Sequence, residues 1–130
     1  NITYSYDGNT VTETFYYPDG GVLSYNSYVF DDKGDNLIKL TLSVSGIWQS
    51  TQEFGDFDDK HYRFTNYPWP WKLRSANNAR SYKLDSAVGG SDHIWKYTYN
   101  QAGYPIKADV YNRGANEIVE TREYIYKNAR

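Results

Sequence analysis

Apolar and polar residues alternate along most of this chain, which is the pattern of β-strands with one buried and one solvated face. The clearest case lies within the predicted strand 37–45, where from residue 38 onward every second side chain is apolar and those between are polar. The apolar set is Ile38, Leu40, Leu42 and Val44, and the polar set is Lys39, Thr41, Ser43 and Ser45. The segment therefore predicts a strand with one dry face and one wet face.

Segments of the same character recur between short turns rich in Gly, Asn and Asp, which are the residues that tight hairpins favour. The predicted strands are 2–6, 10–17, 22–30, 37–45, 47–57, 80–88, 93–100, 104–112 and 118–126. Short connections favour pairing between strands that are consecutive in the sequence. We therefore expect an all-β fold with a single domain over residues 1–130. Its form should be a curved antiparallel up-and-down meander of about nine strands, as an open sheet or a partial barrel.

The segment 22–30 indicates that the sheet is curved, because rings occur on both of its sides. Leu23, Tyr25 and Val29 share one side, and Tyr28 and Phe30 share the other. Trp48 and Trp95 also fall within predicted strands, and we expect both to be core residues.

An internal repeat supports the hairpin interpretation. An aromatic pair with one residue between is followed by three turn residues and Gly. The copies are Phe15/Tyr17/Gly21, Tyr28/Phe30/Gly34 and Tyr97/Tyr99/Gly103. We expect Gly34 and Gly103 to hold equivalent turn positions with positive φ, which only Gly adopts without strain. Gly89-Gly90-Ser91-Asp92 is a further predicted turn.

The long loop at 58–80 breaks the pattern, because Pro68 and Pro70 exclude a central strand there. A loop of this length is uncommon unless it is functional or folds back over the sheet. We expect any helix in the protein to be one or two turns inside this loop.

The composition excludes several kinds of site but does not identify a function. The 130 residues include 15 Tyr, 5 Phe and 4 Trp, which favours strands. The net charge of −2 gives no basic surface for nucleic acid, and no stretch is apolar enough for a transmembrane helix. The absence of Cys excludes disulfides and thiolate metal sites. Because Asn1 is followed at once by strand-like sequence, we expect a fragment that lacks an N-terminal leader and a first strand.

Three short segments carry a family resemblance. They are Phe57-Asp58-Asp59-Lys60, Ser75-Ala76-Asn77-Asn78 and the hairpin from Tyr97 to Lys107. Together they resemble a family of secreted lipoproteins from gut Bacteroidetes, a domain of unknown function with a porin-like β fold. The hairpins also resemble the Tyr-Asp repeats of large bacterial surface and toxin proteins. The resemblance implies a secreted, periplasmic or outer-membrane-associated location, with a lipid anchor outside this chain, and it carries no catalytic residues.

The long loop supplies the candidate ligand site. Trp69 and Trp71 could form a platform on which sugar rings stack, or could fold inward as anchors that hold the loop on the sheet. Tyr67, His61, Asn77 and Asn78 lie in the same loop and could hydrogen-bond a ligand.

Metal and catalytic readings have weaker support in the sequence. The acidic clusters are Asp31/Asp32/Asp35 and Asp56/Asp58/Asp59, and turn formation explains them better than Ca²⁺ binding. His61 and His93 show no zinc-ligand spacing. No Gly-x-Ser-x-Gly segment supports a Ser/His/Asp site. Glu13 and Glu53 could be the pair of carboxylates for glycoside cleavage, but only a structure gives the distance between them. We expect no cofactor.

The sequence thus favours a non-catalytic cell-envelope module that binds a glycan or a small apolar ligand. The first alternative is a structural module that pairs with another chain through its sheet edges. A hydrolase with an unrecognised site is the second alternative.

Overall fold

The computed structural model of this chain describes residues 1–44, 48–61 and 75–126. It contains nine strands in one antiparallel sheet whose spatial order is the order of the sequence. The strands are β1 (Ile2–Asp7), β2 (Thr10–Tyr16), β3 (Val22–Phe30), β4 (Leu37–Val44), β5 (Trp48–Phe57), β6 (Ala79–Ser86), β7 (Gly89–Tyr99), β8 (Pro105–Asn112) and β9 (Ile118–Glu123). The predicted all-β meander is confirmed, and the sheet is open rather than closed into a barrel.

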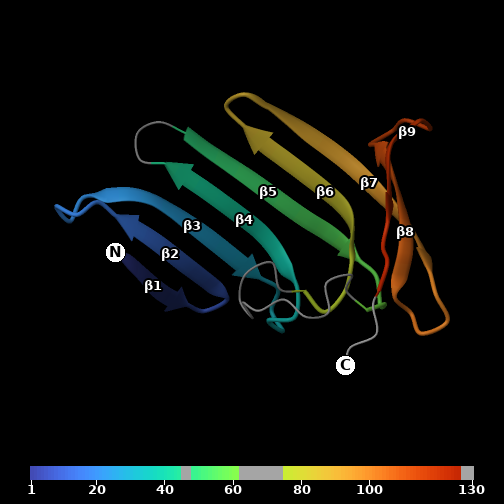
Figure 1. The fold of residues 1–130 in the computed structure, drawn as a ribbon, viewed down its shortest axis with the longest axis horizontal. Coiled ribbons are helices and arrows are strands. Elements are labelled where there is room, and N and C mark those ends of the chain that lie inside the picture. Colours follow the sequence, from blue (N-terminus) through green and yellow to red (C-terminus); the bar gives the residue numbers. More distant parts are fainter. Residues whose placement is uncertain (45–47, 62–74, 127–130) are drawn as a thin grey trace.

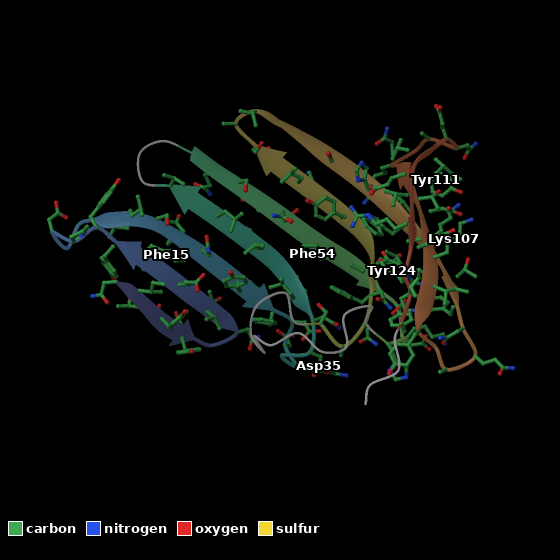
Figure 2. All side chains as sticks on the ribbon, in the orientation of Figure 1. Phe15, Asp35, Phe54, Lys107, Tyr111 and Tyr124 are labelled. Atoms are coloured by element: carbon green, nitrogen blue, oxygen red, sulfur yellow. The ribbon has the colours of Figure 1, made fainter. Side chains whose placement is uncertain are left out.

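The sheet curves strongly at one end. Strands β2–β6 lie side by side, whereas β8 and β9 turn steeply away from that plane (Figure 1). Tyr124 lies on the inner side of this bend, and Lys107 and Tyr111 lie on its outer side (Figure 2). The sheet therefore has a concave face and a convex face.

The concave face holds both apolar clusters of the fold. Cross-strand partners share a face, so the register assigns each residue to one side. One cluster spans β2–β4 and consists of Val11, Tyr28, Phe30, Leu37 and Leu40. The other spans β7 and β8 and consists of Trp95, Ala108 and Val110. Trp95 is buried as expected, while the side chain of Trp48 lies outside the described part of the structure.

One aromatic contact joins the two clusters. Phe54 on β5 packs against the first cluster and Tyr82 on β6 packs against the second. Their ring centroids are 5.4 Å apart, at a separation typical of favourable aromatic pairs. This ring contact therefore links the two apolar clusters across the middle of the concave face.

The convex face of β4–β7 carries a row of charged side chains. Lys39 pairs with Glu53, Glu53 pairs with Lys83, and Lys83 pairs with Asp92 along a row that crosses four strands. Cross-strand neighbours of alternating sign stabilise a sheet modestly. This row needs no ligand to explain it.

Gly34 and Gly103 hold equivalent turn positions, as predicted, with φ of 72° and 85°. The Gly34 N–H donates to the Asp31 carbonyl, and the Gly103 N–H donates to the Asn100 carbonyl. The side chains of Asp31 and Asn100 also accept a hydrogen bond from the backbone N–H of the residue after each glycine. The two hairpins therefore share both their backbone conformation and their side-chain cap.

Two details of the predicted turns are wrong by one or more residues. In the first repeat copy the left-handed residue is Gly20 (φ 91°), not Gly21, because Gly20 closes the turn with the Tyr17 carbonyl. The turn before β7 is Ala87-Val88, so Gly89 and Gly90 belong to the strand. A Cβ on Gly90 would lie 2.5 Å from the Leu84 carbonyl oxygen, so Gly serves close strand approach there.

Two further expectations concern the end of strand β9 and a helical turn in the long loop. Strand β9 ends at Glu123, so the expected extension to residue 126 is wrong. Within the described residues there is no helix, and hence none long and apolar enough to cross a membrane. The helical turn expected in the loop falls largely on residues 62–74, outside the described residues.

We predict that Gly34→Val and Gly103→Val will each lower the free energy of unfolding by roughly 1–3 kcal/mol, because a β-branched residue is strained at positive φ. Urea unfolding would measure the change. Ala102→Val, in the same turn as Gly103, is the matched control and should change stability by less than about 0.5 kcal/mol. Parent-like stability of both glycine variants would contradict the assigned turn geometry.

Candidate functional site

The two ends of the long loop are joined by partly buried hydrogen bonds between Asp58 and Asn78. Asp58 directly follows β5, and Asn78 directly precedes β6. The Asp58 N–H donates to the Asn78 carbonyl at 3.0 Å, and the Asn78 N–H donates to Asp58 Oδ1 at 3.0 Å. Asn78 Nδ2 also donates to Asp58 Oδ2 at 3.2 Å and to the His61 carbonyl at 2.6 Å. Asn78 is fully buried, so it acts as an internal connector.

Tyr99, at the end of β7, is the third component of this connection. Its hydroxyl donates a hydrogen bond to Asp58 Oδ2. Burial raises the pKa of Tyr99, and the hydrogen bond to Asp58 and the negative charge of that carboxylate raise it further. We call Asp58, His61, Asn78 and Tyr99 the loop-base junction.

His61 connects the junction to the β7–β8 hairpin. Its backbone N–H donates to the Gly103 carbonyl at 3.0 Å. Its imidazole ring stacks on Tyr104, with centroids 4.4 Å apart and planes 20° from parallel. The ring itself is exposed.

Asn36 makes a second connection at the start of β4. Its side-chain oxygen accepts from the backbone N–H groups of Ala76 and Asn77, each at 3.0 Å. Its amide donates to Asp31 and to Asn77 Oδ1, each at 3.3 Å. Asn36 also forms an isolated antiparallel bridge with Ser75. The β3–β4 hairpin is thereby tied to the segment that enters β6.

Three of the six predicted site residues lie close together in the structure, and the other three lie outside its described residues. His61, Asn77 and Asn78 lie at the loop base, where Asn77 and Asn78 use their side chains to hold backbone. Trp69, Trp71 and Tyr67 lie outside the described residues. A role in ligand binding stays a prediction for all six, and the contacts of Asn77 and Asn78 are those of structural residues.

A different group of polar side chains lies on the concave face, and the sequence interpretation did not select it. The register places Phe54, Tyr82, His93 and Asn112 in one row across β5–β8. The rings of Tyr82 and His93 are 6.2 Å apart, and the Tyr82 hydroxyl donates to Gln52 Oε1 at 3.2 Å. The alternation of polar and aromatic residues in 80–100 was the signal that could have identified this row.

The same face carries an ion pair beside Trp95. The guanidinium of Arg122 lies over the Trp95 ring, 4.8 Å from its centroid. Arg122 also pairs with Glu120 at 2.8 Å, and both side chains are about half exposed. We call Gln52, Tyr82, His93, Asn112, Glu120 and Arg122 the concave polar row.

The acidic residues of the turns behave as turn formers. Asp19 accepts from the backbone N–H of Gly21, Asp31 from that of Asp35, and Asp58 from that of Lys60. Desolvation alone would raise the pKa of Asp31, but hydrogen bonds from the backbone of Asp35 and Asn36 lower it overall. Within the described residues, no three His, Asp or Glu side chains gather as a metal site would require.

The paired carboxylates considered from the sequence do not face each other. Glu13 pairs with Asn26 and lies on the concave face, where it is buried and accepts from Asn26 Nδ2 at 3.0 Å. Glu53 lies on the exposed convex face. Two carboxylates on opposite faces of a sheet cannot flank one glycosidic bond.

Comparisons of the chain with protein-family models, with curated proteins and with solved structures found no match. The resemblance to secreted Bacteroidetes lipoproteins and to Tyr-Asp repeats therefore stays a prediction. The three segments that carry it do meet in space, because they supply the loop-base junction and its hairpin.

We predict that Asn78→Ala will lower the free energy of unfolding by roughly 1–3 kcal/mol, because it leaves buried acceptors of Asp58 and His61 without their donor. Urea unfolding of the variant would measure this. Asn116→Ala, in an exposed turn, is the matched control and should leave stability nearly unchanged. An equal, small effect of both substitutions would contradict a structural role of the junction.

We predict that the Tyr99–Asp58 hydrogen bond stabilises the protein below about pH 10, the ordinary tyrosine pKa. Tyr99→Phe should cost roughly 1.5–3 kcal/mol at pH 7, as expected for a hydrogen bond to a charged acceptor. Because the pKa is raised in the folded state, this stabilisation should decline as the pH rises above 10. Urea unfolding between pH 7 and 11 would then show the parent and variant converging.

The matched control for this prediction is Asp58→Asn, which removes the charge that the hydroxyl contacts. In the Asp58→Asn background, Tyr99→Phe should lower the free energy of unfolding by less than it does in the parent. The unfolding free energies with and without Tyr99→Phe should then converge little as the pH rises, as a double-mutant cycle would reveal. An unchanged cost in that background would exclude Asp58 as the partner that matters.

Proposed function

We propose that this protein is a non-catalytic binding module that holds a glycan on the concave face of β5–β9. The observation that carries the proposal is the concave polar row. It places two half-buried rings, Tyr82 and His93, in line with the hydrogen-bonding side chain of Asn112 on the concave face.

The chemistry of the row matches that of a sugar chain. Sugars present C–H faces that pack on aromatic rings, and hydroxyls that need donors and acceptors in fixed positions. Asn112 and Gln52 offer both kinds of group, Glu120 accepts, and Arg122 donates. Ligand sites commonly combine apolar surface with a few placed polar groups in this manner.

The same chemistry favours a glycan over the small apolar ligand that the sequence also allowed. An apolar ligand on this face would cover Asn112, Glu120 and Arg122 without replacing their hydrogen bonds to water, which is costly. A glycan replaces those bonds. A place at the cell envelope is consistent with this function but rests on the family resemblance alone.

We predict that the parent protein will bind a glycan on an array, and that His93→Ala and Asn112→Ala will each weaken that binding about tenfold, the effect of losing one useful contact. Titration calorimetry with the best array glycan would measure the affinities. Thr98→Ala, exposed on the convex side of β7, is the matched control and should bind like the parent. Absence of any array signal for the folded parent, or parent-like affinity of both variants, would contradict the proposal.

A further inference from the structure

A hollow lies on the convex face of the sheet, over strands β4, β5 and β6, which run side by side (Figure 1). Its volume is about 260 Å³, and its lining consists of polar side chains, namely Lys39, Thr51, Glu53, Lys83 and Asp85. Pockets for drug-sized ligands begin at about 300 Å³, so this hollow suits a smaller and more polar molecule. It is on the opposite side of the sheet from the concave polar row.

The four charged groups around the hollow are not paired with one another. Among the described residues, none of the five lining side chains takes part in an ion pair or a hydrogen bond. By contrast, Arg80, Arg113 and Arg122 each pair with a carboxylate, at 3.0, 2.8 and 2.8 Å. The alternation of sign along this face needs no ligand, but it leaves the groups at the hollow available to one.

The register arranges the lining side chains in two adjacent rows. Lys39, Glu53 and Lys83 are cross-strand partners in the first row. Thr51 and Asp85 are cross-strand partners in the second row, two residues further along β5 and β6. Glu53 and Asp85 are therefore diagonal neighbours, and so are Lys39 and Thr51. Such diagonal neighbours are about 7–8 Å apart, which leaves room for a ligand group between them.

Each diagonal pair offers one kind of group to a ligand. Glu53 and Asp85 offer carboxylate oxygens, which accept hydrogen bonds from an ammonium group. Lys39 and Thr51 offer an ammonium and a hydroxyl, which donate to a carboxylate. The midpoints of the two diagonals are one strand spacing apart, which is about 5 Å. A ligand whose cation and anion are separated by that distance contacts both pairs at once.

The charges of the lining disfavour simple ions at the same place. A lone cation that reached Glu53 and Asp85 would be repelled by Lys83 on the adjoining strand position. A lone anion at Lys39 would be repelled by Glu53, its cross-strand partner. In a ligand that carries both charges, each charge offsets the repulsion that the other meets.

We propose that the hollow is a binding site for a small zwitterion of the aminocarboxylic acid class. The ammonium of the ligand contacts Glu53 and Asp85, and its carboxylate contacts Lys39 and Thr51. The separation of the two pairs favours an ω-amino acid over an α-amino acid, in which one carbon carries both groups. Binding is weak, with Kd on the order of 1 mM, because exposed charged pairs contribute little. The site does not depend on the proposed glycan function.

Titration of the isotopically labelled 130-residue chain, followed by nuclear magnetic resonance, tests the site. The probe is 4-aminobutyrate, and acetate and ethylammonium at matched ionic strength supply its two ends separately. The amide signals of β4, β5 and β6 should shift to saturation with 4-aminobutyrate. Each half-ligand should bind at least about fivefold more weakly, since it lacks one charged contact. Absence of a saturable shift overturns the proposal, and so does binding of either half-ligand at the strength of 4-aminobutyrate.

Substitutions at the two ends of the site test the assigned contacts. Lys39→Gln and Asp85→Asn should each weaken 4-aminobutyrate binding roughly three- to fivefold, as for a partly exposed charged pair. Both side chains are exposed, so the melting temperature should stay near that of the parent. Lys33→Gln, in an exposed turn, is the matched control for charge and should bind like the parent. Parent-like affinity of either site variant, or equal weakening by Lys33→Gln, overturns the assignment.

His93→Ala, on the concave face, separates this proposal from the glycan proposal. It should bind 4-aminobutyrate like the parent, because the two sites are on opposite faces of the sheet. Loss of 4-aminobutyrate binding in this variant overturns the placement of the zwitterion site on the convex face.

Discussion

The hydrogen bond that Asp58 receives from Tyr99 joins β5 to β7, two strands that the meander itself does not pair. Each strand pairs only with its neighbours in the sequence, so the ladder alone joins β5 to β6 and β6 to β7. Asp58 contacts the start of β6 and the end of β7 at once, and His61 extends this contact to the β7–β8 turn. Side chains at one end of the sheet therefore tie β5, β6, β7 and the β7–β8 turn together.

Most of the fold could be predicted from the sequence because each strand depends on local information. Alternation defines the buried face, as in Leu40 and Leu42, and the turn residues define where the chain reverses. The prediction from sequence is wrong where a glycine that resembles a turn residue is required for close packing between strands. Gly89 and Gly90 form a strong turn signal in the sequence, but the close approach to Leu84 places Gly90 within the strand. Local patterns do not contain such contacts between neighbouring strands.

The candidate site was less predictable because its residues come from several strands. Asn77 and Asn78 were selected as ligand contacts for their polar side chains, but the structure directs those side chains to Asn36, Asp58 and backbone carbonyls. The concave polar row depends on the register of β5 to β9, in which Tyr82, His93 and Asn112 become cross-strand neighbours and Gln52 reaches the Tyr82 hydroxyl. A sequence shows that each of these side chains is polar. Only the register shows that they share a face.

The two outer strands of the sheet, β1 and β9, differ in their charge. An open sheet cannot remove its edges, so each edge must either resist or accept another strand. Strand β9 resists through Glu120, Arg122 and Glu123, two of which also belong to the concave polar row. Strand β1 has no charged side chain between Ile2 and Tyr6. The charged side chains of the concave polar row therefore lie at the β9 end of that face, so Glu120 and Arg122 both protect the edge and belong to the surface that we propose binds a glycan.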